Sequence, residues 1–123
     1  MAGKLVPLVM LPRYSSFVGL PSVNFTTIPV EVSSYQKATL TVWRGPMRSN
    51  WLFRVTCQES SDQQAWTTCS GTNANQFDPG ANTEGVATPG FTKRWFRLSI
   101  ELGSVADMQV TCWAVGHLET RER

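Results

Sequence analysis

The sequence predicts an all-β fold: a single antiparallel β-sandwich, of jelly-roll or immunoglobulin-like type, with little or no helix. Apolar residues alternate with polar ones along several segments, which is the period of a strand with one buried face. No window shows apolar residues at helical spacing behind a capping residue. Seven prolines and nine glycines fall mostly between the alternating segments, as expected for short strands joined by turns. A chain of 123 residues is long enough for one such domain.

Five segments carry the alternation, and we expect each to be a strand. The clearest lies at residues 95–102, where aliphatic and aromatic residues interleave with polar ones. The apolar sets that we expect to face the core are Ile28, Val30 and Val32; Ala38, Leu40 and Val42; Trp51, Phe53, Val55 and Cys57; Phe96, Leu98, Ile100 and Leu102; and Met108, Val110, Cys112 and Ala114.

Two segments interrupt the pattern. Residues 1–25 hold Pro7, Pro12 and Pro21 among apolar side chains, which predicts either an extended N-terminal arm or the first edge strand of the domain. Residues 70–90 have turn composition throughout, which predicts a long loop within a sandwich domain of residues 26–123. A loop of this length is usually functional or mobile, or it contains a short strand.

The charged residues are few and unevenly distributed. Residues 1–56 carry six basic groups against Glu31, whereas the remaining residues carry five basic and eight acidic groups. Halves of opposite charge can meet between copies of the chain or neutralise each other within one fold, and we favour the second. The only compact basic group is Lys93, Arg94 and Arg97, so we do not expect a nucleic-acid partner. No segment has the length and apolar character of a membrane span.

The residues offer no convincing catalytic or metal-binding constellation. His117 is the only histidine, and it lies near a charged tail. Glu59 and Asp62 could imitate a carboxylate pair, but the sequence ESSD is better explained by turn chemistry. Oxygen-bearing side chains between residues 73 and 84 do not have the spacing of a calcium loop. We therefore predict a non-enzymatic protein without cofactor or metal.

Three cysteines, Cys57, Cys69 and Cys112, lack the close spacing of a zinc or redox motif. Cys57 and Cys112 are in phase with apolar neighbours, so we expect both to be buried in the core as free thiols. Such thiols are typical of a reducing compartment during folding.

Three tryptophans provide the functional signal. Trp43, Trp95 and Trp113 are out of phase with the aliphatic residues of their own segments, so they are predicted to face outward, with Arg97 on the same face. Leaving an indole in water forfeits ~2 kcal/mol, so either a second layer of the fold or another molecule must cover these rings. We favour another molecule.

The chain as a whole resembles the small β-sandwich virion proteins of tailed bacteriophages, of the head-decoration, cement or tail-associated class. The likeness consists of the proline-spaced arm from Ala2 to Asn24, the low charge, the free cysteines and strand sequences such as RWFRLSIEL and VTCWAV. It implies a virion protein, assembled in the host cytoplasm, that binds a capsid lattice through its arm and apolar patches, often as a trimer. It carries no motif from which a functional residue can be transferred.

The leading hypothesis is therefore a structural, self-associating or capsid-binding protein. Its predicted contact residues are the tryptophan face with Arg97 and, on the arm, Leu8, Met10 and Phe17. The alternative is a carbohydrate-binding or receptor-binding module, because aligned indoles on a flat sheet also stack on sugar rings.

Overall fold

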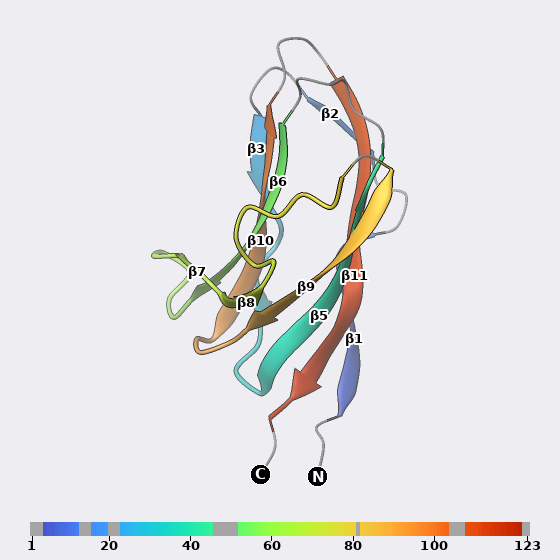
Figure 1. The fold of residues 1–123 in the computed structure, drawn as a ribbon. Helices are drawn as coiled ribbons and strands as arrows, with labels where there is room; N and C mark the ends of the chain where they lie inside the picture. The colour runs from blue at the N-terminus through green and yellow to red at the C-terminus, as the bar shows by residue number, and fades with distance from the viewer. Residues whose placement is uncertain are drawn as a thin grey trace.

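The computed structural model describes residues 4–12, 16–19, 23–45, 52–80, 82–103 and 108–121, and these form two packed antiparallel sheets without a helix (Figure 1). This confirms the predicted fold class. The six-stranded sheet has the order β1 (Leu5–Leu11), β11 (Met108–Thr120), β5 (Tyr35–Arg44), β9 (Thr83–Gly90) and β8 (Ser70–Thr72), with β2 (Ser16–Gly19) also paired to β11. The five-stranded sheet has the order β3 (Val23–Thr26), β10 (Trp95–Gly103), β6 (Leu52–Ser60) and β7 (Thr67–Thr68), with β4 (Val30–Glu31) also paired to β10.

The strands near the two ends of the sequence pair with each other, and so do successive strands toward its middle. β1 pairs with β11, β3 with β10, β5 with β9 and β6 with β7, and successive pairs alternate between the two sheets. The chain is thus one long hairpin rolled into a sandwich, which is the jelly-roll arrangement among the two types that the sequence predicted. The start of β1 and the end of β11 lie side by side in Figure 1, and there the Lys4 amide donates to Thr120 Oγ1 at 2.7 Å.

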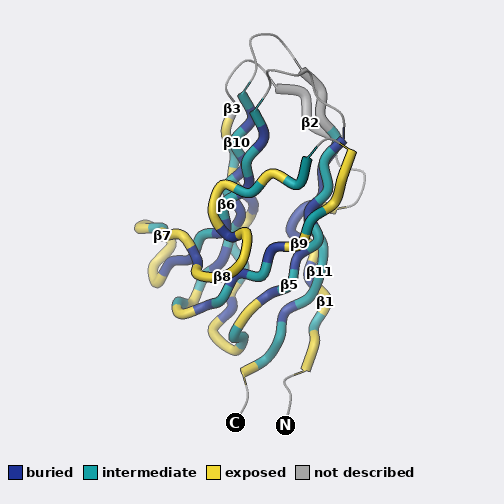
Figure 2. Tube along the Cα trace, viewed as in Figure 1, coloured by how far each residue is buried: buried dark blue, intermediate teal, exposed yellow. Residues whose placement is uncertain are grey.

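The core fills the space between the sheets, and strand periodicity decides which residues enter it. In β10, Phe96, Leu98, Ile100 and Leu102 are buried, while the intervening residues are partly exposed. The same alternation occurs in β5 and β6, so that dark and light segments alternate along these strands in Figure 2. Cys57 and Cys112 are buried in this core, as predicted.

The N-terminal segment is part of the sandwich. Residues 5–11 form β1, an edge strand of the six-stranded sheet, so the edge-strand alternative describes them and the detached arm does not. Proline is compatible with this position because the backbone groups on the free side of an edge strand need no ladder partner.

The segment 70–90 differs from the long loop that its composition predicted. It contains β8 and all of β9, and β9 pairs with β5 in the interior of the six-stranded sheet. Strand formation here depends on the partners that the fold supplies rather than on the intrinsic preference of Gly, Pro and Asn. Between the two strands, Ala74 and Phe77 bond to the backbone of β6, so this stretch closes one side of the sandwich.

A second difference concerns residues 27–32. The sequence predicted one strand with Ile28, Val30 and Val32 facing inward, but only β4 forms there, and Ile28 is 86% exposed whereas Val32 is fully buried. Pro29 lies between β3 and β4 and cannot donate to a ladder, which interrupts the strand and its alternation.

The uneven charge distribution is balanced within the fold. The ion pairs of the described residues join the first half of the chain to the second, because the rolled hairpin places the halves side by side. These pairs are Arg94 with Glu31, Arg54 with Glu101, Lys37 with Glu119 and Arg44 with Asp78. The intramolecular interpretation of the two charged halves is therefore the one that the structure supports.

We expect Leu98→Ala to lower the free energy of unfolding by about 3 kcal/mol, because Leu98 is fully buried between the sheets. The neighbouring Ser99→Ala, on the outer side of the same strand, should change it by less than about 0.5 kcal/mol. Urea unfolding followed by circular dichroism measures both. Similar costs at the two positions would contradict the assigned register of β10.

Candidate interaction surface

Trp43 and Trp113 lie together on the outer face of the six-stranded sheet. They are directly opposite in the β5–β11 ladder, and their rings stack with centroids 4.2 Å apart and planes inclined by 14°. Trp113 is only 8% exposed, yet it is outside the core cluster, because its strand neighbours Cys112 and Ala114 take the inward positions. The predicted outward phase is therefore correct for this pair, and much of the indole surface is covered within the chain.

Trp95 does not join them. It precedes the buried Phe96 in β10, so it faces outward from the other sheet, where it carries the Arg94 guanidinium 5.3 Å from its ring centroid. Arg97 is on the same outer face as Trp95, with its guanidinium 4.0 Å from the ring centroid of Trp66 and its Nε donating to Gln58 Oε1. The prediction that the three tryptophans form a single face is therefore wrong. Alternation tells which side of a strand a residue occupies, but not to which sheet the strand belongs.

A row of three valines and one threonine crosses the six-stranded sheet next to the stacked indoles. Cross-strand pairing aligns Val9 of β1 with Val115 of β11, Val115 with Thr41 of β5, and Thr41 with Val86 of β9. Val9 is 59% exposed and Val86 is 48% exposed, and Figure 2 shows exposed residues along both of their strands. We call the row and the neighbouring indole pair the valine–tryptophan patch; its members are Val9, Thr41, Val86, Val115, Trp43 and Trp113.

A shallow hollow of about 430 Å³ lies over the β1 end of this patch. Pro7, Val9, Pro12, Thr41 and Val115 line it together with Leu8 and Gly116, so its walls are mostly apolar. Leu5, at 60% exposure, extends the apolar surface along β1. The patch therefore combines a flat apolar surface with a hollow that a protruding side chain could fill.

The free edge of β1 is not suited to pairing with another strand. The Thr120 amide donates to the Lys4 carbonyl oxygen. Backbone groups of an antiparallel strand point alternately to its two sides, so the even-numbered residues of β1 direct theirs to β11 and the odd-numbered residues direct theirs to the free edge. Pro7 therefore places its missing N–H on the free edge. Proline in that position interrupts edge-to-edge pairing, so contacts through β1 are expected to use its face.

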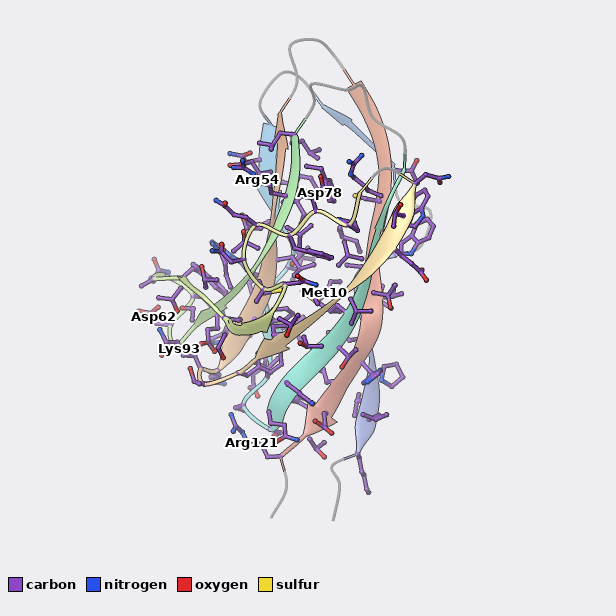
Figure 3. All side chains as sticks on the ribbon, in the orientation of Figure 1. Met10, Arg54, Asp62, Asp78, Lys93 and Arg121 are labelled. Carbon is purple, nitrogen blue, oxygen red and sulfur yellow. The ribbon has the colours of Figure 1, made fainter. Side chains whose placement is uncertain are left out.

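The arm residues that the sequence predicted as contacts have different positions. Leu8 and Met10 face inward from β1 and belong to the core cluster, and Figure 3 shows Met10 between the two sheets. They are therefore not available to a partner in the folded protomer. Phe17 lies in β2, but its side chain is outside the part of the structure that is described. The exposed residues of β1, Leu5 and Val9, were missed, although their alternation with Leu8 and Met10 was visible in the sequence.

A second apolar hollow, of about 460 Å³, opens between β1 of one sheet and β3 and β4 of the other. Met10, Leu11, Phe25 and Val30 contribute to its walls, and the exposed Ile28 lies at it. Among the described residues, this side of the sandwich has no counterpart of the segment that closes the opposite side through Ala74.

The acidic residues near β6 perform structural tasks. Both oxygens of the buried Glu59 carboxylate accept hydrogen bonds from residues 92 and 93, which ties the turn before β10 to β6. Asp62 accepts from the amides of Gln64 and Ala65, while Ser60 Oγ accepts from the amides of Asp62 and Gln63. The turn interpretation of the sequence ESSD is confirmed.

The remaining candidates for chemistry or other partners are separate from one another. Among the described residues, no group of three or more His, Cys, Asp or Glu side chains is placed to hold a metal ion. His117 lies in β11 opposite Pro7 and Thr39. In the basic group, Arg94 pairs with Glu31 and Lys93 Nζ donates to Thr67. The part of the chain that is described has no helix that could cross a bilayer.

Comparison with known proteins finds similarity in fold alone. No protein-family model and no curated protein matches the sequence. The structure of the infectious bursal disease virus Gx strain matches with a TM-score of 0.64 and 8% identity over 95% of this chain and 32% of that chain. The Gt strain structure matches with 0.61 and 8% over 97% and 33%, and the crystal structure of the VP2 subviral particle of this virus with 0.58 and 7% over 95% and 33%.

The chain spans about a third of the length of these solved structures. The matches show the β-sandwich fold that the resemblance implied, and none of these structures is that of a tailed bacteriophage.

Trp113→Ala should lower the free energy of unfolding by about 3 kcal/mol, because it removes a largely buried indole and its stacking contact with Trp43. Trp95→Ala, on the outer face of the other sheet, should cost about 1 kcal/mol. Urea unfolding of the two variants tests this difference. If Trp113→Ala were as stable as Trp95→Ala, the indole stack would not contribute to the fold.

The turn at Asp62 should make stability depend on pH. Hydrogen bonds from the amides of Gln64 and Ala65, and from Ser60, lower the pKa of this carboxyl below 3.8. The contribution of the Asp62 carboxylate to the free energy of unfolding is therefore complete above pH 3.8. It is lost as the pH falls through the lower pKa that Asp62 has in the folded state. At about pH 6 the Asp62→Asn variant should have a lower melting temperature than the wild type, and the two melting temperatures should become equal in more acidic solution. A difference that stayed constant over the titration would refute this assignment.

Proposed function

We propose that the chain is a non-enzymatic structural protein of a virus particle, and that it associates with copies of itself through the valine–tryptophan patch. The observation that carries the proposal is the row of Val9, Val115, Thr41 and Val86 on the outer face of a jelly-roll sheet. An exposed apolar patch with a hollow beside it is typical of an interaction surface.

The comparison with solved structures supports the proposal of a structural role in a virus particle. A sandwich with the fold of this chain occurs in infectious bursal disease virus, whose VP2 forms subviral particles. We infer a comparable assembling role for this chain. The more specific prediction, decoration of a bacteriophage capsid by a trimer assembled in the host cytoplasm, stays a prediction.

The carbohydrate-binding alternative requires a platform of accessible indoles. Trp43 and Trp113 instead stack on each other, and Trp95 is on the opposite side of the sandwich. No observation therefore favours sugar binding over protein contact.

Val9→Asp tests the proposal because Val9 is exposed in the patch and its side chain is not part of the core. A buried carboxylate at the contact should raise the concentration at which assemblies dissociate by roughly tenfold or more. Thr68→Asp is the matched control, since Thr68 is an exposed residue of β7 in the other sheet and lines neither hollow. Light scattering over a dilution series measures the mass of each protein.

The control should assemble as the wild type does. A wild type that stays monomeric at every concentration, or a Val9→Asp protein that assembles as well as Thr68→Asp, would refute self-association through this patch.

A further inference from the structure

Cys57 and Cys69 face each other across the edge of the five-stranded sheet. In the β6–β7 ladder Gln58 is opposite Thr68, so the same register places Cys57 opposite Cys69. The Cys69 amide donates to the Cys57 carbonyl oxygen at 2.9 Å, which continues the ladder to this pair. Residues directly opposite in an antiparallel ladder project to the same side of the sheet. Both thiols are indeed in the core cluster.

This register is compatible with a disulfide bond. The pair shares one hydrogen bond, because the Cys57 amide donates to the Ala74 carbonyl oxygen. Opposite residues of an antiparallel ladder have Cα atoms about 4.5 to 5.5 Å apart, within the range of roughly 4.4 to 6.8 Å that disulfides span. The Cβ atoms of such a pair must approach by roughly 1 Å to reach disulfide geometry. β7 can supply this movement, because it is a two-residue edge strand with both residues exposed.

We propose that Cys57 and Cys69 form a reversible disulfide when the folded protein meets a small-molecule disulfide such as oxidised glutathione. One cysteine thiolate attacks the glutathione disulfide, giving a mixed disulfide and one reduced glutathione. The second cysteine thiolate attacks the protein sulfur of the mixed disulfide and releases the second reduced glutathione. The two protein thiols are thereby oxidised, one glutathione disulfide is reduced to two thiols, and the two protons of the cysteines end on the glutathione thiols.

The surroundings make this bond slow to form. Burial raises the pKa of both thiols, that of Cys57 to about 12, so few thiolates exist in the closed structure. Local opening of the exposed β7 hairpin gives the oxidant access, because Cys69 directly follows Thr68. The bond then ties residues 57–69 into a closed loop that includes the Ser60–Asp62 turn. This goes beyond the proposed function and does not depend on it.

Mass spectrometry of the full chain tests the pair. The protein is incubated with oxidised glutathione below its melting temperature, denatured in acid, and alkylated with N-ethylmaleimide. Of the three cysteines, only Cys112 should be alkylated after oxidation, whereas all three react in the reduced control. Cleavage after Glu59 separates Cys57 from Cys69 along the chain, so the two resulting peptides should stay linked until they are reduced.

Variants and stability complete the test. Cys112→Ala should still form the bond, while Cys57→Ala and Cys69→Ala should each retain two alkylatable thiols. The oxidised wild type should melt roughly 5 to 10 °C higher than the reduced protein, reversibly on addition of dithiothreitol. Three reactive thiols after exposure to the oxidant, a linkage through Cys112, or an unchanged melting temperature of the paired form would overturn the proposal. The peptide linkage in the wild type decides the matter even if a variant fails to fold.

Discussion

The pairing of β11 with β1, β2 and β5 is the interaction on which the rest of the structure depends. This strand brings both ends of the chain and its middle into one sheet. Its inner face supplies Cys112, Ala114 and Leu118 to the core, while its outer face supplies Trp113 and Val115 to the patch. Core and candidate contact surface are therefore two sides of the same strand. Nearly all of its partners are distant in sequence, so the fold requires long-range pairing that is intrinsically slow to form.

The two long sides of the sandwich differ in how they are closed. On one side the segment around Ala74 and Phe77 bonds to the backbone of β6 and covers the gap between the sheets. On the other side β1 approaches β3 and β4 and leaves an apolar hollow with Ile28 exposed beside it. Among the described residues the two sides therefore differ in chemistry, one joined through backbone hydrogen bonds and the other lined by apolar side chains.

The functional proposal rests on the face of the six-stranded sheet rather than on its edge. Pro7 removes the donor that an added strand would need at the free edge of β1, and exposed apolar residues occupy the face next to it. The four ion pairs of the described residues join the oppositely charged halves of the chain within the protomer, and none of them involves a member of the valine–tryptophan patch.

The sequence by itself determined the all-β class, the long strands β5, β6, β10 and β11 and the inward residues of β5, β6 and β10, because a two-residue period is a local property. It also identified Asp62 as a turn residue and the outward phase of Trp43 and Trp113. Only the tertiary structure decided that Trp95 faces away from them, that Leu8 and Met10 are core, and that residues 83–90 form a strand inside a sheet. These features depend on which strands become neighbours, and alternation along one strand contains no information about its partners.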